Sequence, residues 1–300
     1  MAIIRLQHFG IVVESLQKSC EQFERIFGLK ARDYRDDQGK GFQYDARIVL
    51  GNDTWLHIVQ NWNPESRVNQ FLKAHGEGLE HIALETDDIE ADVQHLRELG
   101  VPIYMDKIFD ANDGYEAFVY PDDGIGFTVE LIQPHSHSWG YPDDARDKPV
   151  SSTMGIFQLQ HIGVGLANLQ ASCAKFSQLF RLNCQDFRDD QGKGFQYDSR
   201  VLLGNDCWLH LVQNWNPEAR VYQFHEKAGQ QLEHIALQTA TIEEDVQRLR
   251  DLGVPIYQDR TFDANDGFEA FVYPEDGVGF TVELIQPHKH SWGYKAFSEK

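Results

Sequence analysis

Histidine and glutamate residues recur at two fixed spacings along this 300-residue chain. An offset of 73 residues carries His8 onto His81 and His57 onto Glu130. A second offset, of 153 residues, carries these four onto a further set, namely His161, His210, His234 and Glu283. Imidazole and carboxylate groups together suit Zn²⁺, Fe²⁺, Mn²⁺, Co²⁺ or Ni²⁺, and four protein ligands leave one or two positions open for water or substrate. The spacing therefore predicts up to two divalent-metal sites per chain.

The neighbours of these residues support a metal. In TWLHIVQ, His57 shares a strand face with Trp55 and Val59, and Glu130 in FTVELIQ lies between apolar residues. An ionised Glu in such a place costs several kcal/mol unless it is paired or bound to a cation. Taken singly, each residue could instead be a hydrogen-bonded structural His or an exposed edge-strand Glu. Eight such residues on a double offset favour the metal.

Longer segments repeat with the same large offset. RDDQGKGFQYD at 35–45 returns unchanged at 188–198, and GFTVELIQPH at 126–135 returns at 279–288. The polar segment 141–153, rich in turn-forming residues, lies between the copies and is typical of a linker. We predict two domains, 1–143 and 154–300, each holding one metal site.

Each half contains an older duplication. An apolar strand with an early His, a short turn and an amphipathic helix begin at Leu6 and again at Leu79, with Phe23, Ile26 and Phe27 on the first helix. The second helix has its apolar positions at Val93, Leu96 and Leu99. Shorter runs of β-branched and aromatic residues follow each helix. The pattern predicts an α+β fold made of four βαβββ units.

Composition excludes several classes of function. Lys and Arg number 27 against 47 Asp and Glu, a formal charge of -20, which disfavours binding to nucleic acid or to an anionic membrane surface. The four cysteines, none in a CxxC pair, indicate neither a disulfide framework nor a thiolate metal site, which favours a reducing compartment. With no signal peptide or membrane-spanning run, we expect a cytoplasmic protein that acts on a small molecule as a monomer or homodimer.

These motifs resemble the vicinal oxygen chelate superfamily, above all glyoxalase I and methylmalonyl-CoA epimerase. The likeness lies in QHFGIVVESLQKSCEQFERIFGLK, in the run from WLHIVQNW through LEHIALETDDIEADVQHLRELGVPI, and in AFVYPDDGIGFTVELIQ. The resemblance implies a curved mixed sheet in each half that forms a cup around one metal ion, with ligands at His8, His81 and Glu130. His57 departs from the pattern, because relatives usually have Glu or Gln there. Since both halves keep all four residues, two working sites are expected.

The resemblance also implies which other residues take part in the reaction. Relatives place a proton-carrying carboxylate where this chain has Asp37 and Asp190, although DDQGKG could equally be a solvated hairpin turn. We assign catalytic roles to these two residues and to Glu130 and Glu283. The predicted substrate-binding residues are the arginines, as carboxylate or phosphate clamps, and aromatic pocket walls: Arg35, Arg47, Arg188, Arg200, Tyr44, Tyr197, Trp62 and Trp215.

A metal ion with open adjacent positions stabilises an enediolate or enolate, which favours proton removal next to a carbonyl. The leading hypothesis is therefore a metal-dependent isomerase or epimerase for a keto-sugar, cyclitol ketone, keto acid or acyl thioester. The alternatives are a non-haem Fe(II) extradiol-type dioxygenase, a glyoxalase-like lyase and an antibiotic-binding resistance protein.

Overall fold

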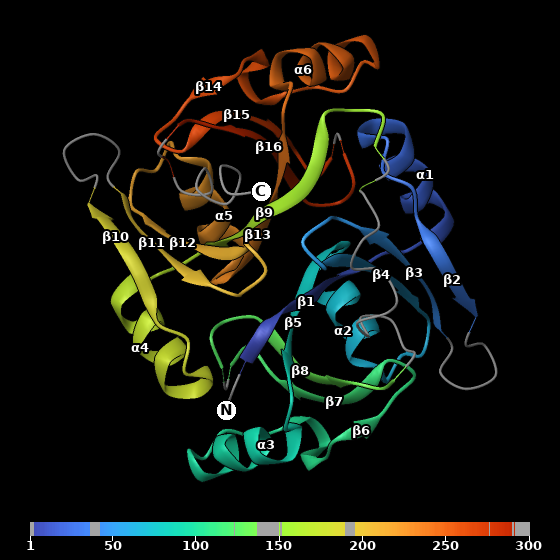
Figure 1. Cartoon of the computed structure of the whole chain (residues 1–300), viewed down its shortest axis with the longest axis vertical. Helices are drawn as coiled ribbons and strands as arrows, with labels where there is room; N and C mark the ends of the chain where they lie inside the picture. Colours follow the sequence, from blue (N-terminus) through green and yellow to red (C-terminus); the bar gives the residue numbers. More distant parts are fainter. Residues whose placement is uncertain are drawn as a thin grey trace. The chain divides into compact units, whose positions relative to one another are not determined.

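A computed structural model describes residues 3–36, 43–122, 124–136, 150, 152–189, 196–275, 277–289 and 291. These residues form two curved eight-stranded sheets (Figure 1), one from each half of the chain. The sheets are mixed, because β5 and β8 pair parallel whereas β3 pairs antiparallel with β4, and β7 with β8. The predicted α+β fold with four βαβββ units is confirmed.

The first sheet has the strand order β2-β3-β4-β1-β5-β8-β7-β6. Its half of the chain comprises β1 (Ile3–Val12), α1 (Leu16–Phe27), β2 (Arg32–Asp36), β3 (Gln43–Val49), β4 (Trp55–Asn61), α2 (Arg67–His75), β5 (Gly78–Thr86), α3 (Ile89–Glu98), the 3₁₀ turn η1 (Tyr104–Asp106), β6 (Phe109–Asp110), β7 (Gly114–Val119) and β8 (Thr128–Pro134).

The second sheet repeats this order as β10-β11-β12-β9-β13-β16-β15-β14. Its half comprises β9 (Ile156–Gly165), α4 (Leu169–Phe180), β10 (Cys184–Asp189), β11 (Gln196–Leu202), β12 (Trp208–Asn214), α5 (Arg220–Ala228), β13 (Gln231–Thr239), α6 (Ile242–Asp251), the 3₁₀ turn η2 (Tyr257–Asp259), β14 (Phe262–Asp263), β15 (Gly267–Val272) and β16 (Thr281–Pro287). In each half the first strands of the two βαβββ units are neighbours, which brings the predicted ligand strands together.

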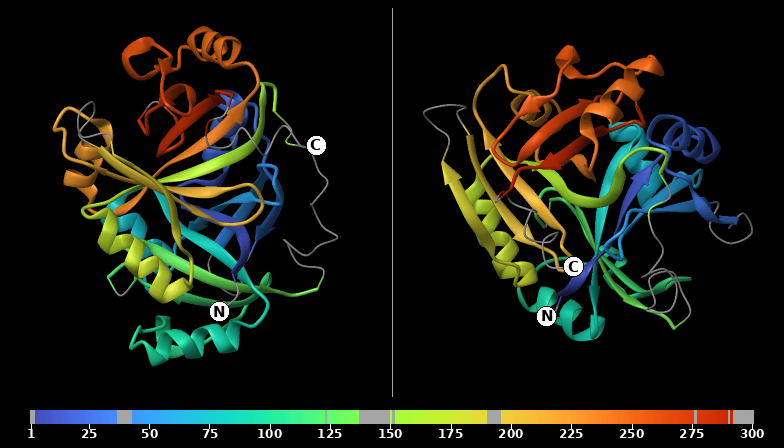
Figure 2. Two further views of the ribbon diagram at one scale, coloured as in Figure 1. Left: turned by 60° about the vertical axis from the view of Figure 1, so that its left-hand side comes forward. Right: turned by 45° about the horizontal axis from the view of Figure 1, so that its top comes forward.

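The helices cover the sheets with the apolar faces that the sequence predicts. Phe23, Ile26 and Phe27 of α1 are fully buried, as are Val93 and Leu96 of α3. Leu99 is different: it is the C-cap residue of α3 and is 38% exposed, because the helix ends before the apolar stripe reaches it. Figure 2 shows α6 lying along β15 and β16, with which it packs.

Two helices were not predicted. α2 and α5 follow the NWNPE segments and are nine residues long. Val68 is the buried residue of α2, and α5 buries none. Because an amphipathic helix is recognised by its apolar stripe, helices with so little buried surface give almost no periodic signal.

One expectation about the cysteines is wrong. Cys173 of α4 and Cys184 of β10 form a disulfide, with their Cα atoms 5.6 Å apart. Cys20 and Cys207 are free and buried. The pairing depends on how a helix and a strand meet in space, which Cys spacing alone does not reveal. The cysteines therefore no longer support a reducing compartment.

The chain divides into two compact units that do not coincide with its two halves. One unit comprises Met1–Phe9, Glu80–Arg146 and Ile162–Glu233, and the other comprises Gly10–Leu79, Asp147–His161 and His234–Lys300. Within the first unit, the rings of Phe127 and Phe176 lie 6.3 Å apart. Within the second, those of Phe23 and Phe280 lie 6.2 Å apart. Helices of one half thus pack against residues of the other. In the described part of the chain, helices with the length and hydropathy of a membrane span are absent.

Gly28 should be one of the least replaceable glycines. It ends α1 in the left-handed region, with φ 66°, and an added Cβ would collide with the backbone nitrogen and Oγ1 of Thr153. Gly100 has a similar φ of 76° but open space around it. Gly28→Ala should therefore lower the free energy of unfolding by about 2–4 kcal/mol, and the control Gly100→Ala by about 1 kcal/mol. Urea denaturation measures both, and equal losses would contradict the predicted collision.

Candidate metal centres

Three predicted ligands of the first half meet at one buried point. His8 lies on β1, His81 on β5 and Glu130 on β8, and all three are buried. The Nε2 atoms of the two histidines are 3.3 Å apart. Oε2 of Glu130 lies 3.5 Å from the first Nε2 and 3.3 Å from the second.

The second half repeats this arrangement. His161 on β9, His234 on β13 and Glu283 on β16 are buried. The two Nε2 atoms are 3.1 Å apart, and Oε2 of Glu283 lies 3.6 Å and 3.2 Å from them.

Both triads fit a divalent metal ion. Ligands about 2.1 Å from an ion are about 3.0 Å apart at right angles and about 3.4 Å apart in a tetrahedron, close to the spacing of these atoms. Two imidazoles and one carboxylate match the donors preferred by Zn²⁺, Fe²⁺, Mn²⁺, Co²⁺ and Ni²⁺. Oε1 of Glu283 is buried and has no hydrogen-bond partner among the described residues. Burying an unpaired carboxylate oxygen costs free energy, and a bound cation would offset this cost.

For three of the four triad histidines, the residue before the histidine fixes the orientation of its ring. Nδ1 of His8 lies 2.9 Å from Oε1 of Gln7, and Nδ1 of His81 lies 2.7 Å from Oε2 of Glu80. In the second half, Nδ1 of His161 lies 2.9 Å from Oε1 of Gln160. An acceptor at Nδ1 places the proton there and leaves Nε2 able to bind a metal. These partners were not among the predicted site residues, although Gln or Glu precedes His in all four units and the same offsets would have found them.

His57 and His210 belong to a charged network on their strands. Nε2 of His57 is 3.7 Å from Oδ2 of Asp45, and Nε2 of His210 is 3.8 Å from Oδ2 of Asp198. The fourth-ligand role of these two histidines stays a prediction.

The carboxylates beside these histidines are held ionised. Burial by itself would raise the pKa of Asp45, but His57 and Arg35 outweigh it and hold that pKa well below its usual range. In the second half, burial is likewise outweighed, and His210 and Arg188 lower the pKa of Asp198 to about 2. Each aspartate is therefore a fixed negative charge against its histidine.

The predicted arginine clamps are engaged with aspartates of their own sheet. Nε of Arg35 donates to Asp45 at 2.6 Å, and Nε of Arg47 donates to Asp33 at the same distance. Arg188 pairs with Asp198, and Arg200 with Asp186, in the second half. Arg47 is directly opposite His57 in the β3–β4 register, so these two residues share a face of the sheet. This pairing favours a supporting role for the arginines.

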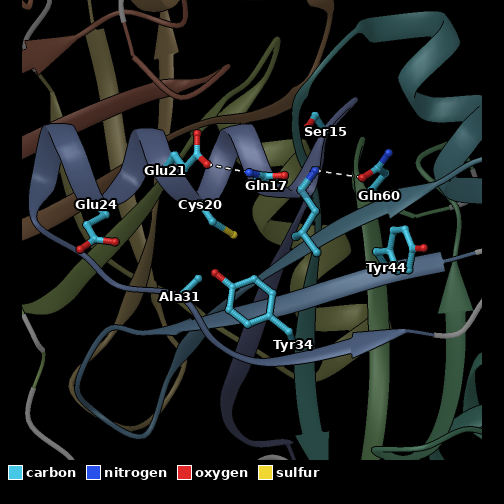
Figure 3. Close-up of a pocket in the computed structure, with 10 residues that line it drawn as sticks. Ser15, Gln17, Cys20, Glu21, Glu24, Ala31, Tyr34, Tyr44 and Gln60 are labelled. Atoms are coloured by element: carbon cyan, nitrogen blue, oxygen red, sulfur yellow. Dashed lines mark hydrogen bonds between the residues drawn. The ribbon is translucent and has the colours of Figure 1, made fainter.

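The two predicted tyrosine pocket walls, Tyr44 and Tyr197, line pockets beside helices α1 and α4. Tyr44 precedes Asp45 on β3, so the alternation of the strand directs it to the opposite face. It lines a pocket beside α1 together with Gln60 (Figure 3), and Tyr197 lines the matching pocket beside α4. The rings of Tyr44 and Trp62 are 4.8 Å apart, as are those of Tyr197 and Trp215. Asp37 and Asp190, the predicted proton carriers, lie outside the described residues.

Comparison with known proteins identifies the family. The model of the Glyoxalase/Bleomycin resistance protein/Dioxygenase superfamily matches residues 5–131 and 158–284, so the chain belongs to this superfamily. The resemblance seen in the sequence is thereby confirmed.

Relatives within the superfamily have different activities. 4-Hydroxyphenylpyruvate dioxygenase of Legionella pneumophila (strain Corby) is 26% identical over 226 residues, 71% of this chain and 63% of that protein. Human mitochondrial methylmalonyl-CoA epimerase is 28% identical over 131 residues, 43% of this chain and 73% of that protein. Hemolysin VllY of Vibrio vulnificus (strain CMCP6) is 22% identical over 207 residues, 66% of this chain, and the match spans 58% of the hemolysin.

A solved structure of a 4-hydroxymandelate synthase mutant from Streptomyces coelicolor shares the fold. Its TM-score is 0.70 at 15% identity, covering 99% of this chain and 96% of that one.

Removal of the Glu80 carboxylate should weaken the first metal centre selectively. Glu80→Ala leaves Nδ1 of His81 without its acceptor, and losing such a partner typically lowers metal affinity about 10–100-fold. Competition against a chromophoric chelator should then resolve one weakened and one unchanged ion per chain, the second site serving as the internal control. Two ions with wild-type affinity would contradict this role for Glu80.

Proposed function

We propose that this protein is a divalent-metal-dependent isomerase or epimerase that removes and returns a proton next to a carbonyl group. The observation that carries the proposal is the pair of His-His-Glu triads, one in each half. The sequence offsets add one further histidine to each set, His57 and His210.

The chain's own residues have defined tasks in this proposal. His8, His81 and Glu130 would hold one ion, and His161, His234 and Glu283 the other, with His57 and His210 as fourth ligands. When bound, the ion supplies a Lewis acid that stabilises negative charge on two neighbouring substrate oxygens. Gln7, Glu80 and Gln160 keep the rings aimed at the centre, so little reorganisation is needed when substrate binds.

The fourth histidine favours proton transfer over oxygen chemistry. Four protein ligands on a six-coordinate ion leave two positions, which suffice for two substrate oxygens. A dioxygenase that also binds O₂ beside a chelated substrate needs a third.

The proton carriers are proposed at Asp37 and Asp190. Among the described carboxylates of the first half, Asp33 is engaged with Arg47 and Asp45 with Arg35. They are thus better suited to supporting the site than to exchanging protons. The substrate class is a keto-sugar, cyclitol ketone, keto acid or acyl thioester.

An Fe(II)-dependent dioxygenase is the second candidate. It is favoured by the 4-hydroxyphenylpyruvate dioxygenase relative, whose match covers most of this chain, and by the two-histidine, one-carboxylate triad, a set that also suits non-haem Fe(II).

Proton exchange tests the first candidate. The protein loaded with Mn²⁺, Co²⁺, Ni²⁺ or Zn²⁺ should exchange the α-proton of a substrate in D₂O, followed by proton NMR across keto-sugars, cyclitol ketones, keto acids and acyl thioesters. Glu130→Gln and Glu283→Gln should each remove the contribution of one site, and the double variant should lose exchange by at least about 100-fold. Absence of exchange from every metal form across this panel would refute the isomerase.

Oxygen uptake separates the two candidates. With Fe²⁺ and a catechol or an aromatic keto acid, the wild-type protein should consume no O₂ above the metal-only control. His57→Ala combined with His210→Ala opens a further position at each ion, so any uptake should appear only in this variant. Stoichiometric uptake by the wild type, measured with an oxygen electrode, would establish the dioxygenase instead.

A further inference from the structure

The two halves differ in their cysteines at one structurally equivalent place. The disulfide joins Cys173 of α4 to Cys184 of β10. At the offset of 153 residues, the matching positions of the first half are Cys20 on α1 and Ala31, just before β2. The helix-side cysteine is therefore present in both halves, but its partner is present only in the second.

In the first half this place is a cavity. Figure 3 shows Cys20, Ala31 and Tyr34 lining a pocket of about 440 Å³ between α1 and the strands beside it. The matching pocket of the second half has about 490 Å³, and its described lining includes Phe187 and Tyr197 but neither of the two cysteines.

The disulfide holds a strand whose charged side chains lead to His210, the proposed fourth ligand of the second metal centre. Two residues after Cys184, Asp186 lies in a bulge of β10 with φ 54° and pairs with Arg200. Arg188, four residues after Cys184, donates to Asp198 at 2.7 Å. Asp198 in turn lies beside His210. A chain of charged contacts therefore runs from β10 to the proposed fourth ligand.

β10 also has few other attachments within its sheet. Among the described strands, it lies at the edge of its sheet and forms ladder hydrogen bonds only with β11. A bulged edge strand is among the more weakly held parts of a sheet. The bond to α4 gives it a second, covalent attachment.

We propose that the Cys173–Cys184 disulfide is a positioning clamp for the second metal centre, and that its reduction loosens this centre while leaving the first unchanged. The part that concerns the metal rests on the proposed function. Both cysteines are partly exposed, so a thiol or dithiol reductant can reach them. In the reaction with a dithiol, the S–S bond breaks, two thiols form, and the dithiol supplies two electrons and two protons as it becomes a disulfide.

Hydrogen exchange tests the clamp without reference to metal. In the full chain, Cys173→Ser with Cys184→Ser should make the amides of residues 184–189 exchange at least about 10-fold faster, while residues 32–36 of the first half keep their rates. Cys20→Ala is the matched control, since it removes the equivalent helix cysteine where no bond exists, and it should leave residues 184–189 unchanged. Reduction of the wild type by dithiothreitol should reproduce the double variant. Equal exchange of residues 184–189 with and without the bond would overturn the clamp.

Metal affinity tests whether the clamp reaches the site. In a His8→Ala background, which silences the first centre, removal of the disulfide by the same two serine substitutions should lower Mn²⁺ affinity by up to about 10-fold. In a His161→Ala background, which silences the second, it should change nothing. An unchanged affinity in both backgrounds would overturn the positioning role. If the wild-type protein binds no Mn²⁺, Co²⁺, Ni²⁺ or Zn²⁺, the proposed function fails, and hydrogen exchange still decides the clamp.

An equivalent disulfide can be introduced into the first half. Ala31→Cys should pair with Cys20, so the oxidised, denatured variant should show one free thiol where the wild type shows two. Residues 32–36 should then exchange more slowly. Three free thiols in the variant would contradict the structural equivalence of the two places.

Discussion

The structure depends on bringing two imidazoles and a carboxylate together where water is excluded. In each half these atoms are 3.1 to 3.6 Å apart and come from three strands. Burying a carboxylate costs free energy unless a positive group lies beside it. The strands must therefore keep their register, because the register places the carboxylate next to the two imidazoles. The central strand order β1-β5-β8, repeated as β9-β13-β16, is what makes this meeting possible.

The alternation of side chains along a strand separates two functions that are adjacent in sequence. On β3, Asp45 and Arg47 lie on the face of His57, whereas Tyr44 lies on the face toward α1. The first face carries a network of paired charges that supports the histidine, and the second packs under a helix. A single strand thus carries both the charged network around His57 and one wall of the outer pocket, and a shift of one residue would exchange the two faces.

Duplication supplied two similar centres, and later changes made their surroundings unequal. The ligand atoms and the Gln before the first histidine are kept in both halves. The edge strands differ, because β10 is bonded to α4 through Cys173 and Cys184, while the first half has Ala31 at the second position. The two triads are therefore alike, whereas the edge strands of their sheets are not.

The sequence by itself determined the four βαβββ units and the two sets of ligand-type residues, because both follow from periodicity and offset, which are properties of order along the chain. Only the tertiary structure decided which of those residues meet. It paired the arginines with Asp33, Asp45 and their counterparts, placed Tyr44 on the other face, and joined Cys173 to Cys184. It also revealed α2 and α5, whose short, mostly exposed surfaces leave no apolar stripe. These features depend on contacts between segments far apart or on opposite faces, and local pattern carries no information about such contacts.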